Sequence, residues 1–305
     1  MLDGVADQLG IIAGRFPAVS AYCKEFTLFL WQKSLKPRRN SYRIEEKEWM
    51  QKGSWMMSKS TEEQRYKLIA LDMDGTLLNR QHEVSKENRQ AIAEAEERGV
   101  QVVLSTGRSI ATCADYAKSL ELSSYLVTVN GSEIWDPEGK LVERNPLQNE
   151  TVQTLWDLRN QHDTHYWAVT TDAVFRKDFP DDIGGHEWLK FGFHTDDDEV
   201  RKAILEELNK NGQLEISNSS PLNIEVNALG INKANALIKV CKRIGITMKE
   251  VLAVGDSLND LAMIKEAGCG VAMGNAQELV KEEADWVTGT NEEDGVAQAI
   301  RRWVL

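Results

Sequence analysis

The sequence predicts an α/β protein with a doubly wound parallel sheet, because strand and helix patterns alternate from residue 67 onward. Residues 68–71 and 102–104 are continuous apolar runs, which are typical of strands buried on both faces of a parallel sheet. The alternation loosens between about residues 147 and 228 and then resumes. Because 305 residues exceed an ordinary single domain, we interpret the loosened stretch as an inserted α/β domain.

The first half of the core is expected to run strand, helix, strand, helix, strand. Ser85 is a good N-cap for the first of these helices, and Gly99 suits the position just after its end. Asn130 and Gly131 stop the third strand. The five expected elements cover residues 68–71, 85–98, 102–104, 110–120 and 126–129.

The same reading predicts the insert and the second half of the core. Clusters of Asp and Gly mark loops between the helical and strand-like stretches of the insert. These stretches are helices near 150–160 and 198–210 and strand-like pieces at 167–170 and 222–226. The second half of the core is expected to contain helices over 233–243 and 258–267 and strands over 251–254 and 270–273.

These patterns divide the chain into three parts. We expect a core made of residues 67–146 and 229–305, an inserted domain of residues 147–228 and an N-terminal extension of residues 1–66. The extension carries 11 Lys and Arg against 8 Asp and Glu, a net charge of +3, whereas the rest of the chain carries −15. Its second half shows no sustained strand or helix period.

Three interpretations of the extension stay open: a small docking arm, a disordered basic tail, or upstream sequence translated from a misassigned start. We favour the last, because Lys52-Gly53-Ser54 can be encoded by a purine-rich ribosome-binding stretch, and Met56 and Met57 follow at once. Mass analysis of the native protein would contradict this hypothesis by finding peptides from residues 1–50.

Composition disfavours several classes of protein. The net charge of −12 argues against nonspecific binding to the phosphate backbone, so no nucleic-acid partner is expected. The 4 cysteines are scattered, without a CxxC pair or a histidine at zinc spacing, which disfavours a disulfide scaffold or zinc site and fits the cytoplasm. The most apolar early stretch, residues 11–31, is interrupted by charges, so neither a membrane span nor a signal peptide is expected.

Four motifs follow strand ends or begin helices, at the edge of the predicted sheet where open α/β folds bind ligands. In the first motif, Asp72 and Asp74 are two residues apart, so both carboxylates point to one side, and Gly75 permits a sharp exit. One aspartate can attack phosphorus, while the other can protonate a leaving oxygen and then activate water. The ordinary alternative is a plain turn, which Asp and Gly also favour.

The second and third motifs offer groups that can hold a phosphoryl group. Thr106 follows the second strand, where its hydroxyl and nearby backbone N–H groups can bind a phosphoryl oxygen, although alone it fits better as a helix N-cap. Lys233 stands in the first turn of a helix that Asn232 can cap, where a cation can offset negative charge. A lone Lys on a helix is usually solvated, so Lys233 is a candidate site residue only because the other three motifs accompany it.

The fourth motif contains two further carboxylates. Asp256 and Asp260 are four residues apart and therefore share one face of a turn or helix. Mg²⁺ prefers oxygen ligands, usually one or two carboxylates together with water and substrate phosphate. The ordinary alternative is an acidic N-cap region at the positive end of a helix dipole.

Together the four motifs resemble the haloacid dehalogenase superfamily of phosphatases, and the resemblance covers about residues 67 to 305. The insert, Asn130-Gly131 and the stretches 270–276 and 291–296 are similar to the Cof-type subgroup, which carries an α/β (C2-type) cap. The resemblance implies a Rossmann-like core with residues 147–228 as the cap domain. Ala234 and Ser109 stand where many relatives have Gly and Pro, and neither difference removes a catalytic group.

The resemblance also implies a role for each motif residue. Asp72 would be the nucleophile and Asp74 the general acid and base, while Asp256 would bind Mg²⁺ directly and Asp260 would support the metal and its water shell. Gly75 and Gly107 would shape the phosphate loops. The full sets are Thr106, Gly107, Lys233 and Asn259 for phosphate, and Asp72, Asp74, Asp256 and Asp260 for metal.

These inferences predict a Mg²⁺-dependent phosphatase that hydrolyses a small phosphorylated metabolite through an aspartyl-phosphate. The resemblance implies a sugar phosphate, pyridoxal phosphate or a phosphorylated flavin precursor as substrate. Two alternatives stay open: a phosphotransferase or phosphomutase that uses the same aspartyl-phosphate, and a non-enzymic binding protein on the same scaffold. The cap residues that select the substrate form no legible motif, and no pattern indicates an oligomeric state.

The aromatic residues of the insert are interpreted as cap core rather than as an aromatic clamp around a substrate. These residues are Trp167, Trp188, Phe191 and Phe193. The histidines of the insert lie at no regular ligand spacing, so core or surface positions are expected for them.

Overall fold

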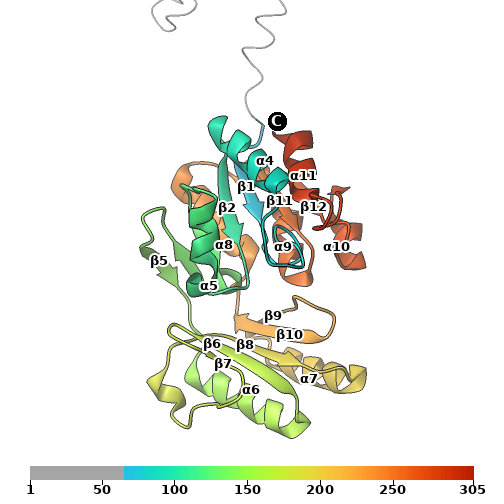
Figure 1. Cartoon of the computed structure of the whole chain (residues 1–305). Coiled ribbons are helices and arrows are strands. Elements are labelled where there is room, and N and C mark those ends of the chain that lie inside the picture. Colours follow the sequence, from blue (N-terminus) through green and yellow to red (C-terminus); the bar gives the residue numbers. More distant parts are fainter. Residues whose placement is uncertain (1–64) are drawn as a thin grey trace, which may run out of the picture. The chain divides into compact units, whose positions relative to one another are not determined.

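The computed structural model describes residues 65–305 (Figure 1). The three interpretations of the N-terminal extension therefore fall almost wholly outside the described residues. Tyr66, which the sequence analysis assigned to the extension, is an exception, because its ring is buried in the core cluster. Tyr66 therefore packs as part of the core.

The larger sheet has eight strands in the order β13-β12-β11-β1-β2-β3-β4-β5. Strands β13 to β3 run parallel, and the β4–β5 hairpin adds two antiparallel strands at one edge. The strands are β1 (Leu68–Leu71), β2 (Gln101–Ser105), β3 (Leu126–Thr128), β4 (Glu133–Trp135), β5 (Leu141–Arg144), β11 (Val251–Gly255), β12 (Cys269–Ala272) and β13 (Trp286–Val287).

Helices cover both faces of this sheet, as the doubly wound prediction requires. Ile69 and Leu71 of β1 pack in the cluster that contains α4, α5 and α11, whereas Leu68 and Ala70 pack in the cluster that contains α8. The helices of this part are α4 (Lys86–Glu97), α5 (Ile110–Ser119), α8 (Lys233–Ile244), α9 (Leu258–Glu266), α10 (Glu278–Glu283) and α11 (Gly295–Trp303). Because all four β1 side chains are fully buried, β1 forms the centre of the core.

The smaller sheet is antiparallel and lies in the predicted insert. Its order is β7-β6-β8-β10-β9, and α6 (Asn149–His162) and α7 (Asp198–Asn211) cover one face (Figure 1). Its strands are β6 (His165–Thr170), β7 (Val174–Phe175), β8 (Trp188–His194), β9 (Leu214–Ser217) and β10 (Asn223–Ala228). The opposite face carries no helix of its own. Several of its side chains meet residues of the larger sheet's loops.

The expected elements are confirmed to within a few residues. Ser85 caps α4 by accepting a hydrogen bond from the Asn88 N–H, and Asn232 caps α8 in the same way through Asn235. The sequence analysis missed the β4–β5 hairpin, because its strands are three and four residues long and lack a continuous apolar run. Among residues 65–305, no helix is long and apolar enough to cross a bilayer.

Candidate active site

The four predicted motifs come together at the carboxyl edge of the larger sheet. Asp72 follows β1, Thr106 follows β2 and Asp256 follows β11, and these three strands are neighbours. Lys233 is the first residue of α8, and its side chain is fully buried. Parallel strands place their following loops at one edge, so residues far apart in sequence meet there.

Three carboxylates and one ammonium form the centre of the site. Oxygen atoms of Asp72, Asp256 and Asp260 all lie within 4.8 Å of one another. The Lys233 Nζ donates to Asp72 Oδ1 at 2.6 Å and to Asp260 Oδ1 at 2.7 Å. When all four groups are ionised, a formal charge of about −2 stays uncompensated in a buried place. A divalent cation would balance that charge, and carboxylate oxygens are its preferred ligands, so these residues fit the metal.

The electrostatics of the cluster follow from this excess of negative charge. Burial, ahead of repulsion from Asp260, raises the pKa of Asp72 well above its usual range, and the Lys233 ammonium opposes that rise. Burial alone would lower the pKa of Lys233, but the carboxylates of Asp260 and Asp72 raise it above its usual value. Lys233 is therefore a permanent cation, in contrast to the solvated side chain that an isolated helical lysine usually presents.

Asp256 is held with its carboxylate toward the cluster. Its Oδ1 accepts from Thr76 Oγ1 at 3.1 Å, and its Oδ2 accepts from Ser257 Oγ at 3.0 Å. Gly75 passes close by with φ of +83°, and a Cβ built there would lie 2.6 Å from Asp256 Oδ2. Burial, then the Asp260 charge, raises the pKa of Asp256 to about 7.

Asp260 has its oxygens occupied by the protein. Besides Lys233, it accepts from the backbone N–H groups of Asp256 and Ser257, each at 3.0 Å, and its side chain is fully buried. These bonds fix the loop after β11 and hold the ammonium in place. Asp260 is thus one of the three carboxylates, and its main effect is to position the loop after β11 and the Lys233 ammonium.

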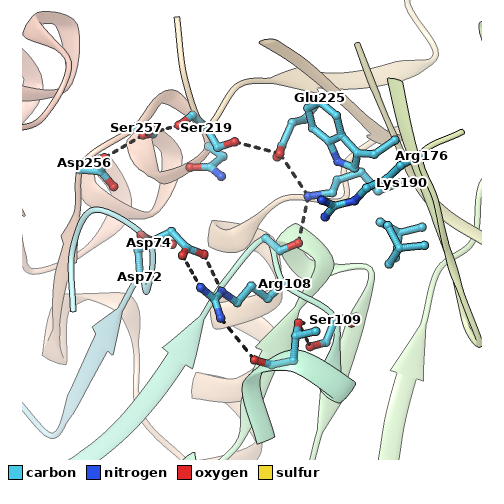
Figure 2. A pocket seen from close by; sticks show the side chains of 16 residues that line it. Asp72, Asp74, Arg108, Ser109, Arg176, Lys190, Ser219, Glu225, Asp256 and Ser257 are labelled. Carbon is cyan, nitrogen blue, oxygen red and sulfur yellow. Dashed lines mark hydrogen bonds and ion pairs between the residues drawn. The ribbon is translucent and has the colours of Figure 1, made fainter. Parts of the chain in front are cut away.

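Asp74 points away from the three-carboxylate group. Its two oxygens accept from Arg108 Nε at 2.7 Å and Nη2 at 2.5 Å, a bidentate pair that lines the cavity and is drawn with dashed lines in Figure 2. The guanidinium also lies over the Tyr116 ring, 5.3 Å from its centroid. The sequence analysis did not assign a role to Arg108, although it directly follows Thr106-Gly107.

The loop after β2 is tightly enclosed. Thr106 is buried, and its Oγ1 accepts from the Arg108 N–H at 3.1 Å. A Cβ at Gly107 would lie 3.0 Å from Asn130 Oδ1 and 3.2 Å from Lys190 Nζ, so a side chain at this position would have to displace both groups. The buried Asn259 donates to Asn130 Oδ1, and its own Oδ1 has no partner among the described residues.

A buried ion pair joins the smaller sheet to this loop. Lys190 Nζ donates to Glu225 Oε1 at 3.2 Å and to the Gly107 carbonyl at 2.9 Å (Figure 2). Asn130 Nδ2 donates to Glu225 Oε2 at 2.6 Å. Burial raises the pKa of Glu225, but the Lys190 ammonium and the Asn130 amide outweigh burial and hold that pKa below its usual value. The sequence analysis missed both charges. Their one signal was a charged residue within each strand pattern, flanked on both sides by apolar residues.

A cavity of about 290 Å³ lies between the carboxylates and the uncovered face of the smaller sheet. Its lining includes Asp72, Asp74 and Asp256 on one side and Trp167 and Lys190 on the other. Trp188, Phe191 and Phe193 are buried in the cap core as predicted. The interpretation was wrong for Trp167, which is only partly buried and lines the cavity, because it points to the opposite face of β6 from Tyr166 and Ala168.

The family follows from two comparisons with known proteins. A family model of haloacid dehalogenase-like hydrolases matches residues 69–189 and 176–300. The 5-amino-6-(5-phospho-D-ribitylamino)uracil phosphatase YcsE of Bacillus subtilis is 62% identical over 249 residues, which are 82% of this chain and 100% of that protein. The chain belongs to the haloacid dehalogenase-like hydrolases.

Other members of the family agree with this assignment. The 5-amino-6-(5-phospho-D-ribitylamino)uracil phosphatase YitU of Bacillus subtilis is 30% identical, covering 77% of this chain and 97% of that protein. A solved haloacid dehalogenase-like hydrolase from B. subtilis has a TM-score of 0.71 and 28% identity, covering 77% of this chain and 99% of that one. With these relatives and this carboxylate cluster, the chain is a phosphatase of the family, and its cluster fits a divalent metal.

Divalent-cation binding is expected to weaken as the pH falls below about 7, because a proton on Asp256 then competes with the cation. The raised pKa also means that protonation stabilises the metal-free fold, and that this stabilisation is lost as the pH rises from about 4 to about 7. Thermal unfolding with chelator and with added MgCl₂ should show a larger rise in Tm at about pH 8 than at about pH 6. Equal rises at both values, or the same difference in Asp256→Asn, would contradict this account.

Replacing the buried ammonium is expected to destabilise the metal-free fold. Lys233→Met leaves three buried carboxylates without a cation, which should lower the free energy of unfolding of the metal-free protein by about 3 kcal/mol. Urea denaturation in chelator measures this change. Lys242→Met, on the exposed side of the same helix, is the matched control and should change stability by less than about 0.5 kcal/mol. A Lys233→Met protein as stable as the control would refute the charge argument.

Proposed function

We propose that the protein is a Mg²⁺-dependent phosphatase of 5-amino-6-(5-phospho-D-ribitylamino)uracil, a phosphorylated flavin precursor. The observation that carries the proposal is the group of three carboxylates beside a cavity that the smaller sheet covers. The chain that holds this site is 62% identical to a phosphatase named for that compound. A second relative named for the same compound supports the choice over a sugar phosphate or pyridoxal phosphate.

The metal we propose is Mg²⁺, since the donor set consists of hard carboxylate oxygens. Asp72 and Asp256 would hold it, together with the main-chain carbonyl of Asp74, and Asp260 would act by fixing the loop and the ammonium. When bound, the ion would supply charge that offsets the phosphoryl oxygens. The unpartnered Oδ1 of Asn259 is suited to accept from a water or hydroxyl at this place.

Asp72 is the proposed nucleophile. Lys233 binds its Oδ1, which leaves Oδ2 free to attack phosphorus. The new bond from Asp72 to phosphorus forms as the bond from phosphorus to the ester oxygen breaks, and the leaving oxygen takes a proton from Asp74. Thr106, the Gly107 backbone, Lys233 and the Asn259 amide would bind the phosphoryl oxygens, because positioning and charge neutralisation dominate phosphoryl transfer.

Hydrolysis of the aspartyl-phosphate completes the cycle. Asp74, now a carboxylate, takes a proton from water as the water oxygen attacks phosphorus, and inorganic phosphate and the free Asp72 carboxylate result. For both proton transfers the Asp74 carboxyl must turn from Arg108 toward the substrate. In the bidentate pair with Arg108 both Asp74 oxygens accept, so before the first transfer Asp74 must leave Arg108 and take up a proton from solvent, and it gives that proton back when it returns to Arg108.

The proposal also includes the expected compartment, the class of partner and the domain bounds. A cytoplasmic metabolite enzyme agrees with the scattered cysteines, and the charge of −12 agrees with a small-molecule partner rather than nucleic acid. The parts named core and cap would be residues 67–146 with 229–305 and residues 147–228.

The two aspartates are expected to differ in how their loss depends on the leaving group. Asp72→Asn should abolish phosphate release from every ester. Asp74→Asn should lower kcat/KM, which reports the steps up to release of the leaving group, by about 10²- to 10⁴-fold for the ribityl ester, and by clearly less for p-nitrophenyl phosphate, whose leaving group needs no protonation. The assay is phosphate release with Mg²⁺ and with chelator. Equal losses on both esters would contradict the acid role, and a rearranged phosphate ester without free phosphate would indicate a mutase.

A further inference from the structure

The uncovered face of the smaller sheet forms the roof of the cavity in two rows of side chains. Trp167 pairs with Gly192, and Gly192 pairs with Glu225, so these three positions lie across β6, β8 and β10 on one face. Val174, Val169 and Lys190 form the neighbouring row. The roof is therefore charged over β8 and β10 and apolar over β6 and β7.

The charged part of the roof is already occupied by the protein. Lys190 and Glu225 bond to each other and to the loops of the larger sheet. The apolar part has no such partners. Val174 is 41% exposed, and neither the Arg176 guanidinium nor the Trp167 indole N–H makes a hydrogen bond to another described residue. Figure 2 shows Arg176 on the cap side of the cavity, across from Asp72 and Asp256.

Gly192 determines how the indole of Trp167 lies. A Cβ built on Gly192 would be 2.2 Å from Cε2 and 2.3 Å from Cζ2 of that ring, so the ring covers the glycine face-on. Its other face is turned from the sheet toward the cavity that Trp167 lines. Because Gly192 has no side chain, the indole of Trp167 can lie flat against β8 and present one face to the cavity.

We infer that Trp167 and Arg176 bind the ring of the leaving group, a planar heterocycle that carries carbonyl oxygens. The indole face would stack on the ring, Val169 and Val174 would border it, and the guanidinium would donate to its carbonyls. This inference rests on the proposed function, because the ribitylamino chain of that substrate would connect the ring to a phosphate at Asp72. A plain sugar phosphate has no flat ring for this indole.

The test compares two esters that share the ribityl 5-phosphate and differ in the ring: 5-amino-6-(5-phospho-D-ribitylamino)uracil and D-ribitol 5-phosphate. Wild type should prefer the first. Trp167→Ala and Arg176→Gln should each lower kcat/KM for the ring-bearing ester by about tenfold or more, mainly through KM, with the ringless ester changed by less than about twofold. Trp167→Phe keeps a flat ring and should retain most of the preference.

Two controls separate recognition from structure. Lys177→Gln removes the same charge one residue away, outside the cavity lining, and should leave both esters unchanged. Gly192→Ala should tilt the indole and reduce the preference, with the folded state checked by thermal unfolding. Equal losses on both esters, or none on either, would overturn the inference, as would a wild type that hydrolyses both equally well. A wild type that hydrolyses neither would instead overturn the proposed function.

Discussion

The rest of the site depends on the two bonds that the buried ammonium of Lys233 makes to carboxylates. The ammonium binds one oxygen of Asp72 and one of Asp260, and it is the cation that those two carboxylates share inside the protein. Without it, carboxylates so close together could not all stay ionised in a buried place. With it, they still keep enough negative charge to attract a divalent cation, so one lysine makes the proposed nucleophile and the proposed metal site compatible.

The fold supplies this arrangement through chain connectivity. The strands β1, β2 and β11 place three loops at one edge, and α8 begins there immediately after the chain leaves the smaller sheet. The roof is joined to the same place by Lys190, which reaches the Gly107 carbonyl. A change in the position of the smaller sheet would therefore move the loop proposed to bind phosphate. The face proposed to select the substrate and the loop proposed to bind phosphate are thus joined by this contact.

Most of the core could be predicted from the sequence, because its signals are local. The run Leu68–Leu71 followed by Asp72 and the capping residues Ser85 and Asn232 each act within a few residues. The orientation of Trp167 could not be predicted, since residues 166–169 of β6 are all apolar or aromatic and show no alternation. The orientation of the indole depends on pairing with Gly192, which lies opposite Trp167 only in the folded sheet. The Lys190–Glu225 pair escaped prediction for the same reason, because its members are 35 residues apart.

The most direct test of the account is to trap the phosphoryl group on the protein. Asp74→Asn should slow hydrolysis of the aspartyl-phosphate, so acid quenching during turnover of ³²P-labelled p-nitrophenyl phosphate, whose leaving group needs no acid, should leave label on the chain. Peptide mapping should place that label on Asp72 when Mg²⁺ is present and find none with chelator or in Asp72→Asn. Phosphate release at an undiminished rate from Asp72→Asn, or label on another residue, would contradict the account.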